Sequence, residues 1–212
     1  GSQGIGLMAG TVYANRVYLV GGACTQDATP VNANDPCSPT YSGNRKDTIY
    51  AAIDSSNNIV DAVSGSSGGT WKFTTAQMSP VRRRAVAVGY NGYIYSLAGY
   101  SGTASLQDLL FSKINVSTGD IGTFESSGVV VTPRWDLRAI VSNGYVYAIG
   151  GCGAGAAPNS CSSMQAEVQT FQLYNNDSGT PVSYAASANQ FATDRMGASS
   201  TILNGYLYVA GG

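Results

Sequence analysis

Side chains that could carry out chemistry are sparse in this chain, and histidine is missing altogether. The 212 residues include 11 Lys or Arg and 12 Asp or Glu. Without histidine the chain has no Ser-His or Cys-His nucleophile pair, and it lacks the commonest metal ligand. Carboxylates such as Asp47, Asp61, Asp120 and Asp136 are scattered and form no close pair in the sequence. We therefore expect no catalytic residue, no metal site and no cofactor.

Four cysteines form two local groups, Cys24 with Cys37 and Cys152 with Cys161. Each group begins just after a Gly-Gly pair, so a bridge within each group would brace a loop. We favour this pairing over the other two that four cysteines permit. Free thiols are the alternative, and a zinc site is disfavoured because the chain has neither Cys-x-x-Cys spacing nor histidine. Disulfides form in oxidising compartments, so we expect an extracellular or cell-surface protein.

The elements that position these side chains are repeated along the chain. The tract Asn-Gly-Tyr-aliphatic-Tyr begins at Asn91, Asn143 and Asn204, and a looser copy begins at Asn15. Each tract leads into a Gly-Gly or Ala-Gly pair. We call the position seventeen residues before the second glycine of this pair the repeat position. It is occupied by Ile5, Arg82, Arg134 and Arg195. Self-similarity at intervals of about 50 residues indicates a repeat architecture.

Each repeat has the pattern of antiparallel β structure. Asn-Gly between two aromatic and β-branched runs is the strongest short-range hairpin signal. Third strands are expected near residues 47–53, 109–115 and 168–174, and fourth strands near 70–74, 121–125 and 182–185. No segment has a convincing apolar stripe of helical period. Charged residues make up 11% of the chain, against a usual quarter, as is typical of turn-rich β proteins.

This repeat resembles the kelch repeat. It shares an arginine sixteen residues ahead of a Gly-Gly pair, an aromatic-aliphatic-Tyr run before that pair, and an aromatic residue upstream of the next arginine. These aromatics are Trp71, Phe124 and Tyr184. The resemblance covers nearly the whole chain and implies an all-β fold, a β-propeller of four-stranded antiparallel blades. Ala98 replaces the first glycine of one pair, and the first copy lacks both the arginine and the Asn-Gly turn.

The expected blades cover residues 5–75, 82–128 and 134–188, followed by two inner strands over 195–212. Three and a half blades do not close a ring, because propellers have about four to eight. We therefore expect residues 1–212 to be a single kelch-like domain and a fragment of a longer propeller. A small propeller closed by a shortened last blade is the alternative.

Candidate ligand-binding residues come from the resemblance. In kelch proteins the ligand face often uses the residue directly after the Gly pair and the residue two positions after the repeat arginine. This implies Tyr100 and Arg84 in the second blade and Asp136 in the third. The alternative for Arg84 is a structural role at the entry to a strand, within the run Arg82–Arg84.

The longest loop, residues 23–46, supplies two further candidates, Tyr41 and Arg45. Long loops on a rigid scaffold are where binding specificity usually lies. A bridge between Cys24 and Cys37 would tie this loop at its base.

Charge and hydropathy limit the partners. A net charge of −1 gives no electrostatic footprint for nucleic acid. No apolar run reaches the roughly 18–20 residues that a bilayer span needs. We expect a non-enzymatic recognition or adhesion module that binds a protein or a glycan.

Two other functions stay open. One is a glycosidase or lyase that uses carboxylates such as Asp47 or Asp136, because residues distant in sequence can meet as an acid–base pair. The tract from Ser64 to Trp71 resembles the Asp-box turn of sialidase-type propellers, but Ser66 replaces its Asp. The other is a structural subunit that self-associates through open blade edges.

Overall fold

The computed structural model describes residues 5–24, 45–61, 71–74, 77–154, 161–173, 178–187 and 189–212. All regular structure in these residues is β, as the sequence predicts, and neighbouring strands are antiparallel. The described part of the chain contains no helix long and apolar enough to span a bilayer.

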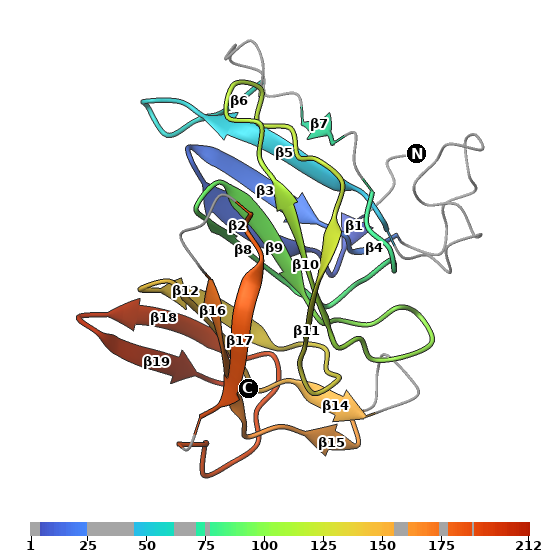
Figure 1. Cartoon of the computed structure of the whole chain (residues 1–212), viewed down its shortest axis with the longest axis vertical. Coiled ribbons are helices and arrows are strands. Elements are labelled where there is room, and N and C mark those ends of the chain that lie inside the picture. Colours follow the sequence, from blue (N-terminus) through green and yellow to red (C-terminus); the bar gives the residue numbers. More distant parts are fainter. Residues whose placement is uncertain are drawn as a thin grey trace.

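Three sheets follow one plan, in which consecutive strands lie side by side (Figure 1). Sheet 1 contains β2 (Ala9–Tyr13), β3 (Arg16–Val20), β5 (Thr48–Ile53) and β6 (Ile59–Val60), with β7 (Lys72–Phe73) also on β5. Sheet 2 contains β8 (Val86–Tyr90), β9 (Tyr93–Leu97), β10 (Asp108–Lys113) and β11 (Glu125–Val130). Sheet 3 contains β12 (Arg138–Ser142), β13 (Tyr145–Ile149), β16 (Val168–Leu173) and β17 (Pro181–Ala186).

Three shorter pairs complete the described strands. They are β18 (Ser199–Leu203) with β19 (Tyr206–Ala210), β1 (Ile5–Gly6) with β4 (Ala23–Cys24), and β14 (Cys152–Ala154) with β15 (Ser163–Met164). The fourth strand of sheet 2 begins later than the sequence predicts. Ile121 forms only an isolated bridge with Ile114, which closes the turn ahead of β11.

The inner hairpins turn as their sequences require. Asn91, Asn143 and Asn204 have φ of 46°, 51° and 51°, and each is followed by a glycine with positive φ. Two consecutive positive φ values characterise the type I′ turn, which matches the twist of the flanking strands. Ala14 and Asn15 adopt the same conformation at 49° and 57°, so the first copy keeps the turn without a glycine.

The sheets stack through their first strands. β2 packs on β8, β8 on β12, and β12 on β18, while β11 contacts β17 farther out. One apolar core, with Tyr95, Phe111 and Phe171, fills the space between sheets 2 and 3. A second, with Tyr18, Ile94 and Leu110, lies between sheets 1 and 2. The described sheets do not form a closed ring.

Tyrosines at one repeat position connect each sheet to the next. The Tyr18 hydroxyl of sheet 1 donates to the Gly119 carbonyl of sheet 2 at 2.9 Å. The Tyr95 hydroxyl of sheet 2 donates to the Gly179 carbonyl of sheet 3 at 2.7 Å. Burial raises the pKa of both hydroxyls, that of Tyr18 to about 12. The repeat therefore encodes the contact between sheets as well as the sheets themselves.

The repeat arginines hold the second strand to the third. Arg82 and Arg134 are fully buried, and each donates to a carbonyl sixteen residues ahead, that of Ala98 or Gly150. Each also forms an ion pair of 2.7 Å with a carboxylate where the third strand begins, Asp108 as the first residue of β10 or Glu167 directly before β16. The third carboxylate of this kind, Asp47, is paired with Arg45. In the first unit, where the repeat position is Ile5, an arginine from elsewhere thus forms the ion pair.

Candidate functional site

A chain of backbone hydrogen bonds crosses the four units just before their inner strands. Leu7, Arg84, Asp136 and Gly197, each two residues after the repeat position, have φ of 58°, 53°, 51° and 68°. The Arg84 amide donates to the Leu7 carbonyl at 3.0 Å, Asp136 to Arg84 at 2.9 Å, and Gly197 to Asp136 at 2.9 Å. Positive φ is uncommon outside glycine, so its recurrence here marks positions that the surrounding structure holds in place.

Arg84 and Asp136, both selected from the sequence, meet at this point. The Arg84 Nη1 lies 2.6 Å from the Asp136 Oδ2, with side chains 16% and 23% exposed. The Arg84 guanidinium also lies 4.9 Å above the ring of Trp135, which is buried. A cation over an aromatic face is attracted by the ring quadrupole. The pair is therefore fixed in position and still reaches solvent.

A hollow of about 270 Å³ lies between the first strands of sheets 1, 2 and 3, and its lining includes Ala85, which directly follows Arg84. We call it the inner hollow. Its lining residues are Met8, Ala9, Gly10, Ala85, Val86, Ala87, Arg138 and Ala139. Most of these side chains are small, so they leave space and keep the backbone accessible.

The strand register makes the inner hollow polar. In a two-residue hairpin the pairs alternate between hydrogen-bonded and non-hydrogen-bonded, counting from the turn. Gly10, Ala87 and Ala139 fall in non-hydrogen-bonded pairs, opposite Leu19, Ser96 and Ala148. Their N–H and C=O groups therefore point to the open edges of the inner strands and offer hydrogen bonds to a ligand.

Arg138 is the only charged residue that lines the inner hollow. Five cations form ion pairs between described residues, and Arg138 is not among them: Arg45, Lys72, Arg82, Arg84 and Arg134. The only hydrogen bond of the Arg138 side chain to the described residues is a long one of 3.3 Å from Nη1 to the Leu137 carbonyl. A half-buried guanidinium without a carboxylate partner favours an acidic group in the hollow.

Sequence reasoning missed Arg138, although the repeat contains a signal for it. Four residues after the repeat position, the units have Ala9, Val86, Arg138 and Ser199. A single charge at an otherwise small or apolar repeat position could have been noticed. The role of Arg138 could not have been predicted, because the hollow is created only when the three sheets pack together.

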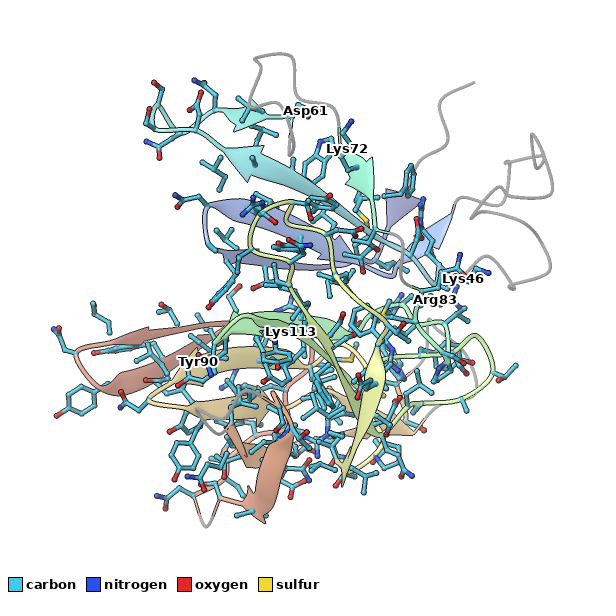
Figure 2. The ribbon with its side chains drawn as sticks, turned by 45° about the horizontal axis from the view of Figure 1, so that its top comes forward. Lys46, Asp61, Lys72, Arg83, Tyr90 and Lys113 are labelled. Carbon is cyan, nitrogen blue, oxygen red and sulfur yellow. A yellow bond between two sulfur atoms is a disulfide. The ribbon has the colours of Figure 1, made fainter. Side chains whose placement is uncertain are left out.

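The other proposed binding residues lie elsewhere. Tyr100 is 1% exposed, in a cluster with Trp135 and Cys152, and the Arg83 guanidinium lies 5.3 Å from its ring centroid. This packing covers the ring and does not present it to a ligand. Arg45 is 3% exposed and bound to Asp47. Figure 2 shows Arg83 near Lys46, the residue after Arg45, and away from Tyr90.

One of the two expected disulfides is confirmed. Cys152 and Cys161 are bonded, with a Cα–Cα distance of 5.7 Å, and the bridge braces the connection that contains β14 and β15. Cys37 and Tyr41 lie outside the described residues, as does the bridge expected from Cys24 to Cys37. Residues 64–70 of the Asp-box-like tract lie outside them too.

The two carboxylates named as candidates for an enzyme, Asp47 and Asp136, each form an ion pair with an arginine. Asp47 binds Arg45 and Asp136 binds Arg84, so neither is available as a general acid or base without breaking an ion pair. The described residues include no group of three or more His, Cys, Asp or Glu side chains arranged to hold a metal ion.

No protein-family model and no curated protein sequence matches this chain.

Proposed function

We propose that this chain is a secreted or cell-surface recognition module, a β-propeller of kelch type that binds a protein or a glycan at the inner hollow. Three features support the propeller: sheets of one plan, stacking through their first strands, and a hydrogen-bonded chain of equivalent residues across the units. The disulfide between Cys152 and Cys161 supports an oxidising compartment.

The observation that carries the binding site is the position of Arg138. It lines a polar hollow of about 270 Å³ without a carboxylate partner among the described residues, and the Arg84–Asp136 ion pair is formed by residues one or two positions before lining residues. Small concave sites with a few convergent polar groups are the usual form of a ligand site. The ligand group that fits is a carboxylate, on an acidic sugar or an acidic side chain.

A glycan array and a pull-down from extracellular proteins, each run with the full chain and with Arg138→Gln, would test this function. We expect a ligand that carries a carboxylate, and a loss of at least about tenfold in affinity with Arg138→Gln, because the charge-assisted contact is removed. Lys113→Gln, which removes an exposed cation at the far end of β10, is the matched control. Equal affinity of Arg138→Gln for every ligand found would move the site away from the hollow.

A further inference from the structure

An exposed turn follows β10 in sheet 2, and it contains the tract Asn115-Val116-Ser117. Asn-x-Ser, in which x is any residue except proline, is the acceptor sequence for N-linked glycans on the surface of secreted proteins. All three residues are exposed, and Val116 is 81% exposed. An apolar residue this open adds nothing to the core, so packing does not account for the tract.

The backbone holds this turn in one place. The Asn115 amide donates to the Asp120 carbonyl at 2.8 Å, and the Gly119 amide donates to the Asn115 carbonyl at 2.7 Å. The Gly119 carbonyl in turn accepts a hydrogen bond from the hydroxyl of Tyr18, a buried residue of sheet 1. Asn115 therefore lies on a fixed turn where sheets 1 and 2 meet.

The Asn115 side chain uses its oxygen for the turn and leaves its nitrogen open. The Oδ1 atom accepts hydrogen bonds from the Ser117 amide at 3.0 Å, the Ser117 hydroxyl at 2.6 Å and the Thr118 amide at 3.3 Å. Such bonds from an asparagine oxygen to the next residues are a common way to close a turn. The Nδ2 atom forms no hydrogen bond to the described residues. A sugar on Nδ2 would keep all three bonds of Oδ1.

The corresponding turn of sheet 1 shows that the fold does not require asparagine here. Asp54 occupies the position equivalent to Asn115, since the third strands of the two sheets pair with the second strands in the same register. Its Oδ1 accepts hydrogen bonds from the amides of Ser56 and Asn58, both at 2.8 Å. A carboxylate thus closes the same kind of turn. The turn explains an acceptor oxygen at this position, but it does not explain the amide nitrogen of Asn115.

We propose that Asn115 is a site of N-linked glycosylation. The Nδ2 atom loses one proton to a base of the transferase and forms a bond to C1 of a sugar carried on a lipid diphosphate. The bond from C1 to the diphosphate oxygen breaks, and the lipid diphosphate leaves. The proposal rests on the secreted location in the proposed function, because this transfer takes place in the secretory pathway of eukaryotic cells.

A glycan at this site would leave the inner hollow open. Lys113, at the end of β10, pairs with Tyr93 at one end of β9. Val86, which lines the hollow, pairs with Leu97 at the other end of β9. These two ends are about 13 Å apart along the strand. The modified and unmodified chains should therefore bind a ligand of the hollow equally well.

Secretion of the full chain from cultured human cells, behind a cleavable leader, tests the proposal. Digestion of the folded protein with a peptide N-glycosidase should remove a glycan and leave aspartate in place of Asn115, which peptide mass spectrometry detects. Asn115→Asp and Ser117→Ala should each abolish the modification, and Ser117→Thr should keep it. Asn176→Gln removes the second Asn-x-Ser tract of the chain, so that the mass change reports Asn115 alone.

Asn115→Asp is the matched variant, because Asp54 shows that a carboxylate keeps the turn. Thermal unfolding of this variant and of the original chain, both made without glycans, should therefore coincide. An unmodified Asn115 would overturn the proposal, whether the chain is exported or retained, because the transfer precedes export. A glycosylated chain that binds no ligand would contradict the proposed function and support the glycosylation site. A chain that binds its ligand with Asn115 unmodified would do the reverse.

Discussion

At the scale of single residues, the buried ion pairs decide how stability responds to acid. Burial alone would raise the pKa of Glu167, but hydrogen bonds from Gln169 and Arg134 outweigh it and hold the pKa below its usual value. The folded protein therefore binds this proton less readily than the unfolded chain does. The stability from Glu167 is complete above its unfolded pKa and is lost as the pH falls through the folded value.

Glu167→Gln should accordingly lower the free energy of unfolding at neutral pH by about 2 kcal/mol, because Arg134 is left buried without its carboxylate. The fall in stability on acidification should also become shallower. Urea unfolding at several pH values measures both effects. Glu125→Gln removes an exposed carboxylate and should change stability at neutral pH by less than about 0.5 kcal/mol. A full acid slope in Glu167→Gln would show that other groups control it.

The raised pKa of Tyr18 predicts a loss of stability at alkaline pH, the opposite direction to Glu167. Burial raises its pKa from the ordinary 10.0 to about 12, so the unfolded chain loses this proton first. The stability contributed by Tyr18 is complete below pH 10 and declines as the pH rises toward 12. Tyr18→Phe should lose roughly 1 kcal/mol at neutral pH through the missing bond to Gly119, and should decline less above pH ~10.

Denaturant unfolding at about pH 9 and about pH 11 compares these slopes directly. Tyr206→Phe is the control, because Tyr206 is 69% exposed. An identical alkaline decline in Tyr18→Phe and the unmodified chain would contradict the assignment.

At the scale of elements, turns that contain glycine pack against tyrosine rings of the neighbouring sheet. Gly179 has φ of +67°, and a Cβ there would meet the buried ring of Tyr93. Gly128 on β11 has φ of +72° but open space around the added Cβ. Gly128→Ala should cost roughly 1 kcal/mol of backbone strain, and Gly179→Ala roughly 2–4 kcal/mol because steric overlap is added. Thermal unfolding of the two variants isolates the packing contribution; equal losses would mean that Tyr93 can move aside.

At the scale of the whole molecule, stability should be uneven between the sheets. Sheet 2 is packed between sheets 1 and 3, and every residue of β9 is buried. The β18–β19 hairpin packs on β12 through β18 and exposes Leu203, Tyr206 and Tyr208. Hydrogen exchange should therefore be slowest in β9 and β13 and much faster in β18 and β19, which open locally. Uniform protection across all these strands would contradict this gradient.

How much of the structure could be predicted from the sequence depends on how local each feature is. The all-β class, the Asn-Gly hairpins and the Cys152–Cys161 bridge depend on residues close together in the chain, so their patterns were sufficient. The repeat position also identified Arg84 and Asp136 as equivalent residues of successive units. Their spacing says that they are equivalent but not that they touch.

The tertiary structure alone decided how these units meet and which side chains remain accessible. Stacking of the first strands brings Arg84 to Asp136 across 52 residues and encloses the inner hollow beside Arg138. The same stacking buries Tyr100 against Trp135, and it leaves Arg45 to pair with Asp47 in the unit that lacks the repeat arginine. These outcomes depend on the angle and register between sheets. Contacts across the whole chain set that geometry, and no local pattern of residues contains it.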